Sequence, residues 1–270
     1  MTLAADPGPV PLPAGLDALP APFRVIGYDV LGSTNDTAKA FAREGAGHGL
    51  AIWAREQTRG RGRQGRDWRS PPGNLYLSVV LQPDVALERL GEVSFVVAVA
   101  VAEAIAGAIA DPGLVRLKWP NDILIAGGKV AGILMETESA PSGGVAWLVM
   151  GLGVNVESAP VGLPYRAVAL AEYGSSLDCA AMVAAVLTRL DVLWRLWLDD
   201  GFAPIRARWR ALGHRPGDRL SVRQGDGSIE GAFVDLDGDG ALVIETATGP
   251  IRIMAGDVFP VAPASCSQAG

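Results

Sequence analysis

A segment rich in arginine and glycine, residues 55–69, is the part of this sequence best suited to bind an anion. It holds six arginines against two acidic residues, in a chain of 270 residues whose formal net charge is -6. Arg61 and Arg63 alternate with glycines, so the backbone can approach a ligand closely while planar guanidinium groups donate paired hydrogen bonds to carboxylate or phosphate oxygens. We therefore predict a mobile loop that closes over a small anionic ligand.

The glycines of this loop fit two phosphate-binding patterns only in part. Residues 60–65 read G-x-G-x-x-G, but the dinucleotide-binding form of that pattern must open a helix, and Pro71 and Pro72 follow too soon for one. A P-loop would need lysine and then serine or threonine where Arg66 and Asp67 stand. A nucleic-acid interface that uses this local positive charge stays open as an alternative, although an acidic chain repels phosphate at long range.

Three further motifs combine polar side chains with residues that let a ligand approach the backbone. They are Lys118-Trp119-Pro120-Asn121-Asp122, Lys129-Val130-Ala131-Gly132-Ile133-Leu134 and Gly151-Leu152-Gly153-Val154-Asn155-Val156. The X-Pro turn of the first fixes an amide and a carboxylate, and the glycines of the other two leave positions without side chains. Taken singly, each could equally be a turn, a surface lysine or a β-bulge.

Short apolar segments alternate with helical ones from residue 23 onward, which predicts an α+β fold with a mixed β-sheet packed against helices. The predicted strands span residues 25–30, 50–54, 75–81, 115–118, 123–126, 130–138 and 146–156, and the predicted helices span 34–44, 90–110, 177–197 and 202–212. Ser33 stands at the N-cap position of the first helix. Gly127-Gly128 predicts a tight hairpin turn just before Lys129.

The sequence divides into three predicted parts. Residues 1–22 form a proline-rich, flexible tail without chemistry, residues 23–216 a catalytic domain, and residues 217–263 a small β-barrel whose short strands are separated by glycine and aspartate turns. A composition of 49% hydrophobic and 19% charged residues excludes a disordered chain. The tail lacks the features of a secretory signal, and only Cys179 and Cys266 are present, so we expect a cytoplasmic protein.

The order of the motifs is more specific than any one of them. Gln57-x-x-Gly-Arg-Gly-Arg-x-Gly-Arg-x-Trp precedes Lys-Trp-Pro-Asn-Asp, Lys-x-Ala-Gly-Ile-Leu and Gly-x-Gly-x-Asn, and Ser33-Thr34-Asn35 lies upstream. Over residues 24–262 the chain closely resembles the biotin protein ligase family, the biotin–[acetyl-CoA carboxylase] ligases. The resemblance implies a catalytic domain of the class II aminoacyl-tRNA synthetase and biotin ligase type, followed by an SH3-like β-barrel.

Members of this family convert biotin and ATP to biotinoyl-5′-AMP and pyrophosphate, and then pass the biotinyl group to a lysine of a biotin carboxyl carrier domain. The resemblance implies catalytic roles for Lys129, Arg61 and Arg63. It implies biotin contacts from Ser33, Thr34, Asn35, Gln57, Arg61, Gly62, Arg63, Lys129, Gly132 and Gly153, and ATP or adenylate contacts from Trp68, Asn121, Asp122 and Asn155. Mg²⁺ is implied with ATP, and the sequence does not identify its ligands.

The same resemblance sets the expected partners and the nearest alternative. The partner would be the carrier domain of acetyl-CoA carboxylase or another acyl-CoA carboxylase, without a membrane, and a homodimer is left open. Some relatives carry an N-terminal winged helix-turn-helix, but 22 residues before Phe23 are too few for one, so we expect a monofunctional enzyme that does not bind DNA. The alternative is a lipoate ligase or octanoyl transferase. The transferase branch is expected to use a cysteine, and neither cysteine lies in a motif.

Overall fold

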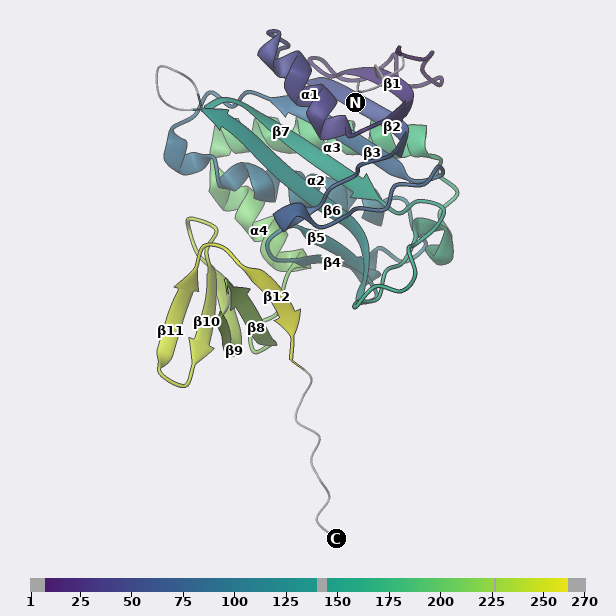
Figure 1. The fold of residues 1–270 in the computed structure, drawn as a ribbon. Helices are drawn as coiled ribbons and strands as arrows, with labels where there is room; N and C mark the ends of the chain where they lie inside the picture. Colours follow the sequence, from purple (N-terminus) through teal and green to yellow (C-terminus); the bar gives the residue numbers. More distant parts are fainter. Residues whose placement is uncertain (1–7, 140–144, 226, 262–270) are drawn as a thin grey trace.

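The computed structural model describes residues 8–139, 145–225 and 227–261, which form a large mixed sheet with helices and a smaller second sheet (Figure 1). The large sheet has the strand order β1-β2-β3-β7-β6-β5-β4. Its strands are β1 (Arg24–Leu31), β2 (Leu50–Gln57), β3 (Leu75–Leu81), β4 (Val115–Lys118), β5 (Asp122–Ile125), β6 (Gly128–Ser139) and β7 (Val145–Val154). The first pair, β1 and β2, is parallel, and every other neighbouring pair is antiparallel. The predicted mixed sheet is therefore confirmed.

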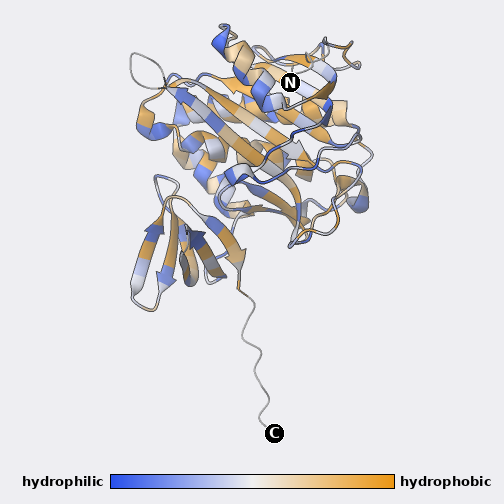
Figure 2. Ribbon diagram, in the orientation of Figure 1, coloured by the Kyte–Doolittle hydropathy of each residue, from blue (hydrophilic) through white to orange (hydrophobic). Residues whose placement is uncertain are grey.

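Helices cover both faces of the large sheet. Helix α1 (Thr34–Arg43) packs on one face, against β2, β3 and β7. Helices α2 (Glu92–Ala106), α3 (Cys179–Asp200) and α4 (Phe202–Leu212) pack together on the other face. The strands between them carry mostly hydrophobic residues, coloured orange in Figure 2. Buried side chains accordingly form two separate cores, one on each face of the sheet.

The apolar segment around α2 forms a buried helix, as the sequence predicts. Most of its residues have no exposed surface, because the helix lies between the sheet and the pair α3 and α4. No helix in the described part of the chain is long and apolar enough to cross a lipid bilayer.

The second sheet lies after α4 and contains only antiparallel strands. These are β8 (Arg219–Gln224), β9 (Gly227–Leu236), β10 (Leu242–Thr246), β11 (Gly249–Ile253) and β12 (Asp257–Pro260), in the order β11-β10-β9-β8-β12. The arrangement agrees with an SH3-like fold. The edge strands β11 and β12 do not pair with each other within the described residues, so the sheet is not a closed barrel.

Two local features differ from the sequence-based expectations. The described part of the predicted flexible tail packs on the domain: the Val10 amide donates to the Gly27 carbonyl (2.8 Å), and Leu16 is only 4% exposed. The hairpin turn before Lys129 is shifted by one residue, since Ala126 and Gly127 have the positive φ angles and Gly128 begins β6. A Cβ atom on Gly128 would lie 2.5 Å from the Val168 side chain, so packing rather than turn geometry requires that glycine.

Candidate active site

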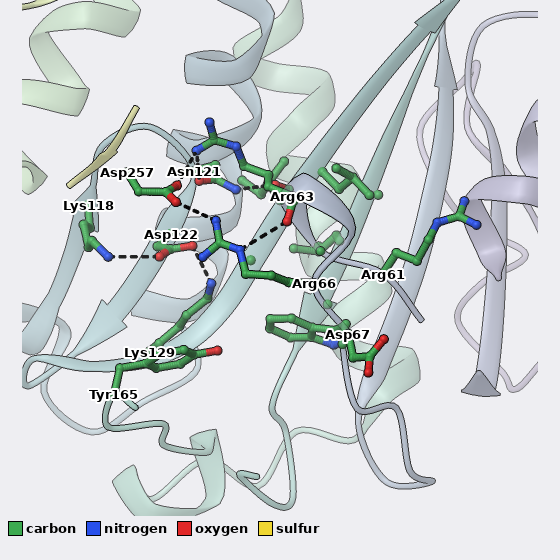
Figure 3. A pocket seen from close by; sticks show the side chains of 18 of the residues that line it. Arg61, Arg63, Arg66, Asp67, Lys118, Asn121, Asp122, Lys129, Tyr165 and Asp257 are labelled. Atoms are coloured by element: carbon green, nitrogen blue, oxygen red, sulfur yellow. Dashed lines mark hydrogen bonds and ion pairs between the residues drawn. The ribbon is translucent and has the colours of Figure 1, made fainter. Parts of the chain in front are cut away.

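A cavity of about 420 Å³ opens over the middle of the large sheet, beside the arginine-rich loop and the second sheet (Figure 3). All but one of the residues singled out from the sequence line it. They are Ser33, Thr34, Asn35, Gln57, Arg61, Gly62, Arg63, Trp68, Asn121, Asp122, Lys129, Gly132 and Gly153. Segments far apart in the sequence, from Ser33 to Phe259, thus meet in a single site.

Glycines on β6 and β7 form a floor without side chains. The antiparallel register pairs Gly132 with Gly153 and Leu134 with Gly151, so the glycines are neighbours in the sheet. A Cβ atom on Gly153 would overlap the Trp68 ring, and one on Gly151 would overlap the Asn35 amide. The glycines are needed because other side chains lie directly against the backbone there.

One end of the cavity, which we call the hydroxyl-amide end, is lined by Thr34, Asn35 and Gln57, and the fully buried Ser78 supports it from outside the lining. Both the amide and the hydroxyl of Thr34 donate to the Gln57 side-chain oxygen, at 2.8 and 3.0 Å. The Ser78 hydroxyl lies 2.7 Å from the Thr34 hydroxyl and 2.5 Å from Asn35 Oδ1. Thr34, Asn35 and Ser78 are buried, so these bonds hold the polar atoms in place before a ligand arrives. Ser78 was not predicted from the sequence.

Charged side chains from α1 and β6 support this end. The Asn35 amide donates to Glu136 (2.6 Å), which also accepts from Lys39 (2.8 Å). Partial burial tends to raise the pKa of the Glu136 carboxyl, but hydrogen bonds from Lys39 and Asn35 outweigh it and hold the pKa below its ordinary value. The Glu136 carboxylate therefore stays ionised and orients the Asn35 side chain.

Arg61 is turned away from the centre of the cavity, toward α1. Its guanidinium donates two hydrogen bonds to Asp36, at 2.6 and 2.9 Å. Burial acts to raise the pKa of Asp36, yet the hydrogen bonds from Arg61 and Lys39 lower it overall. In this structure Arg61 is therefore held by a carboxylate outside the cavity, whereas the sequence predicts that it closes over a ligand.

The opposite end of the cavity, which we call the cationic end, consists of Arg63, Arg66, Lys118 and Lys129. Both lysines contact Asp122, Lys129 at 2.6 Å and Lys118 at 3.3 Å. The Lys129 ammonium also lies 5.5 Å from the centre of the Trp68 ring and 5.6 Å from that of Tyr165. These contacts place a fixed positive charge beside the glycine floor.

The arginine-rich loop between β2 and β3 folds back on itself. The Gly62 amide donates to the Arg66 carbonyl (2.7 Å), and the Trp68 amide donates to the Gly60 carbonyl (3.0 Å). At its tip Arg63 donates to the Asn121 side-chain oxygen (3.1 Å), and Arg66 pairs with Asp257 (2.7 Å). The loop is thus already folded at the edge of the cavity, with its guanidinium groups paired to protein oxygens.

Several lining residues were not predicted as site residues. They are Arg66, Lys118, Tyr165, Arg166, Asp257 and Phe259. Arg66 and Lys118 belong to motifs recognised in the sequence, so their place could have been inferred. Asp257 and Phe259 lie in β12 of the second sheet, and no local pattern connects them to the cavity.

Asn155 is the one predicted residue that does not line the main cavity. It is buried, its side-chain amide donates to the Val168 carbonyl (3.0 Å), and it lines a smaller neighbouring cavity of about 180 Å³. The two cavities share Trp68, Lys129 and Tyr165 in their walls. Asn155 therefore lies beside the site, in a position where it holds the backbone.

Comparisons with known proteins agree across both parts of the chain. The model of the "Biotin/lipoate A/B protein ligase family" matches residues 27–155, and that of the "Biotin protein ligase C terminal domain" matches residues 217–259.

Individual relatives are also similar over most of their length. The biotin–[acetyl-CoA-carboxylase] ligase of Paracoccus denitrificans is 36% identical over 84% of this chain and 96% of its own. The bifunctional ligase/repressor BirA of Bacillus subtilis is 34% identical over 87% of this chain and 73% of its own. The structure of the biotin protein ligase from Aquifex aeolicus in complex with biotin and ATP matches with a TM-score of 0.76 and 28% identity, covering 88% of this chain and 99% of that one.

Proposed function

The chain belongs to the biotin protein ligase family, and from this premise we propose that it joins biotin to ATP and then to a lysine of a biotin carboxyl carrier domain. The observation that carries the proposal is the single cavity in which a hydrogen-bonding end, a glycine floor and a cationic end follow one another. Biotin has a matching order of groups: a urea ring, an apolar chain and a carboxylate.

In the first step a carboxylate oxygen of biotin attacks the α-phosphorus of ATP and pyrophosphate leaves. The nucleophile is already ionised and the leaving group is good, so the reaction needs alignment and neutralised charge more than a proton-transfer residue. Lys129, Arg61 and Arg63 supply positive charge for this purpose. Lys129 is the best placed of the three, because it is already fixed beside the glycine floor.

The hydroxyl-amide end would bind the urea ring, whose N–H and C=O groups need partners once they are buried. Ser33, Thr34, Asn35 and Gln57 provide hydroxyl and amide groups there. The apolar chain of biotin would cross the floor at Gly132 and Gly153, and Gly62 would let the loop close over it. The hydrogen bonds within this end support a rigid pocket rather than one formed on binding.

The nucleotide would occupy the cationic end and the smaller cavity beside it. We propose that Trp68 packs against the adenylate, that Asn121 and Asp122 face the phosphates, and that Asn155 supports the adjoining backbone. Within the described residues, no group of three His, Cys, Asp or Glu could hold a metal ion. Both Asp122 oxygens are already ion-paired to lysine, so Mg²⁺ fits this site as a companion of the triphosphate rather than as a resident ion.

In the second step the neutral amine of the acceptor lysine attacks the acyl carbon of biotinoyl-5′-AMP, and AMP leaves. Sequestering the mixed anhydride under the folded loop would protect it from water until the carrier domain arrives. We propose that residues 23–216 carry the reaction and that the described part of residues 217–263 completes the cavity wall. Cytoplasmic location, lack of DNA binding and the oligomeric state stay predictions.

The biotin reaction is favoured over the lipoate or octanoyl alternative. Two of the three proteins compared above are named for biotin, and the chain has no cysteine among the residues that line the described cavity. Burial raises the pKa of the Cys179 thiol to about 11, which suits a packed side chain better than a nucleophile. Family membership likewise favours a small ligand over the nucleic-acid interface that the arginines left open.

The proposal is tested by biotin-dependent exchange between ATP and radiolabelled pyrophosphate in the purified protein, followed by biotin transfer to an isolated carrier domain. We expect biotin to stimulate exchange and lipoate and octanoate to have no effect. Stimulation by lipoate or octanoate alone would refute the assignment to biotin.

A further inference from the structure

One carboxylate of the second sheet reaches into the cavity of the large domain. Asp257, the first residue of β12, lines the cavity, and its side chain is only 16% exposed. One of its oxygens lies 2.7 Å from the Arg66 guanidinium and the other 3.5 Å from that of Arg63 (Figure 3). A side chain nearly 200 residues away in sequence therefore supplies one negative charge that the two arginines at the loop tip share.

Asp257 is the carboxylate that both of these arginines contact among the described residues. Arg63 otherwise donates to Asn121 Oδ1 and, at 3.4 Å, to the Gly256 carbonyl, while Arg66 donates to the Arg63 carbonyl and Gln64. These other acceptors are neutral. The loop backbone is closed by its own hydrogen bonds, so Asp257 is not needed to make the turn.

The second sheet is firmly seated on the large domain at another point. The buried Trp119 ring nitrogen donates to the Gly240 carbonyl (3.3 Å), and a Cβ atom on Gly240 would lie 2.5 Å from the Phe95 ring. The sheet that carries Asp257 is thus held independently of the arginines. The seating of the second sheet therefore does not depend on the ion pairs of Asp257.

We propose that Asp257 is a tethered substitute for the ATP phosphates: it holds Arg63 and Arg66 across the cationic end until the triphosphate arrives and displaces it. A guanidinium donates to carboxylate and to phosphate oxygens in the same paired geometry, so the exchange keeps its donors satisfied. The inference rests on the proposed function, because it assumes that phosphates bind at this end. It makes Asp257 a positioning residue and an internal competitor of ATP.

Competition between Asp257 and ATP sets the direction in which ATP affinity should change when the carboxylate is removed. ATP must break two ion pairs before it can form its own, so removing the carboxylate should strengthen ATP binding even though the arginines are unchanged. Removing the carboxylate should also make the arginine-rich loop more mobile when no ligand is bound. A residue that merely stabilised the site would have the opposite effect on ATP binding.

The test uses Asp257→Asn, which keeps the shape of the side chain and removes its charge. The matched control is Asp239→Asn, since Asp239 is a 74% exposed carboxylate in the turn between β9 and β10 that pairs with Arg252. Binding of a non-hydrolysable ATP analogue is measured by calorimetry, and KM values for ATP and biotin by pyrophosphate exchange. We expect ATP to bind about 3–10-fold more tightly to Asp257→Asn, with kcat and the KM for biotin changing less than about twofold.

Trypsin cleavage after the loop arginines gives a second readout without catalysis. Ligand-free Asp257→Asn should be cut faster than the wild type and the control, and the ATP analogue should protect all three proteins equally. Asp257→Glu, which restores a carboxylate, should return both readouts toward wild type. Thermal unfolding verifies that each variant is folded.

The inference is overturned if Asp257→Asn binds ATP as the wild type does, or more weakly. Its failure differs from failure of the proposed function. A wild-type protein without biotin-dependent exchange refutes the function. Normal wild-type exchange with unchanged ATP binding in Asp257→Asn refutes only the role of Asp257 as a competitor of ATP.

Discussion

At the hydroxyl-amide end of the cavity the polar side chains bond mainly to one another, whereas at the cationic end they pair with carboxylates that a ligand must replace or share. Thr34, Gln57 and Ser78 form a closed set of hydrogen bonds within the large domain. Arg63 and Arg66 depend on Asp257 from the second sheet. The difference indicates that the first end selects a ligand by fixed geometry, and that the second end responds to charge by changing partners.

The largest effect is expected from removing Lys129, a cation that Asp122 already holds beside the glycine floor. Lys129→Ala should lower the rate of adenylate formation by ~10²–10³-fold, because it deletes a preorganised charge where negative charge develops. The measurement is biotin-dependent pyrophosphate exchange, with thermal unfolding as the control for folding. Near-normal exchange would mean that Arg63 and Arg66 alone neutralise enough of the developing negative charge.

Arg63→Gly tests whether the arginine-rich loop retains the intermediate in the cavity. We expect biotinoyl-5′-AMP to dissociate roughly 10–100-fold faster, since a charge-assisted contact at the cavity edge is lost. Released adenylate would then label unrelated proteins, which is detected by blotting for biotin. Arg55→Ala is the matched control, because Arg55 pairs with Asp29 outside the cavity. If Arg63→Gly retains biotinoyl-5′-AMP as well as the wild type does, Arg63 does not hold the intermediate in the cavity.

Ser78→Ala tests the fixed end. It leaves the buried Asn35 side-chain oxygen without its donor and removes one of the two partners of the Thr34 hydroxyl. The free energy of unfolding should therefore fall by about 1–3 kcal/mol and the KM for biotin should rise about tenfold, with kcat little changed. Chemical denaturation and steady-state kinetics measure the two effects. Ser94→Ala removes an exposed hydroxyl of α2 and should change neither. An unchanged KM would show that the hydrogen-bonded set does not orient biotin-binding groups.

The smallest expected effect concerns pH. Asp36 and Glu136 have pKa values below their ordinary 3.8 and 4.5, because hydrogen bonds from cations outweigh burial. Their ionised forms therefore stabilise the fold above the ordinary values, and that contribution is lost as the pH falls through the lowered values. The free energy of unfolding of the wild type should drop more steeply below about pH 4.5 than that of Glu136→Gln, by less than about 1 kcal/mol. If the free energy of unfolding of the wild type and of Glu136→Gln falls equally with pH, Glu136 makes no such contribution.

The local elements could be predicted well because each is encoded within a few residues. Strands β3 and β4 and helix α4 begin and end where apolar periodicity and turn residues indicate. The hairpin before Lys129 was misplaced by one residue, because two adjacent glycines serve different purposes: Gly127 has the positive φ, and Gly128 makes room for Val168. Local sequence does not distinguish a turn glycine from a packing glycine.

The parts of the site that escaped prediction depend on tertiary contacts. Ser78 lies within an apolar strand and supports the lining residues Thr34 and Asn35 only because α1 packs across β3. Asp257 acts on a loop nearly 200 residues away through the packing of one sheet on the other. By contrast, the arginine-rich loop and the lysine motifs were found because their composition is unusual at close range. The proline-rich tail was predicted to be free, since composition does not reveal that Leu16 reaches the core.

The choice of arginine or lysine around the cavity affects whether the protein acylates its own side chains. An acyl-adenylate acylates neutral amines, and the chain contains only Lys39, Lys118 and Lys129 as lysines, against 23 basic residues in all. Each of the three is ion-paired to a carboxylate, and a protonated ammonium has no lone pair with which to attack. The loop uses arginine, whose guanidinium stays protonated. The protein can therefore surround a reactive intermediate with positive charge and still avoid becoming its own acceptor.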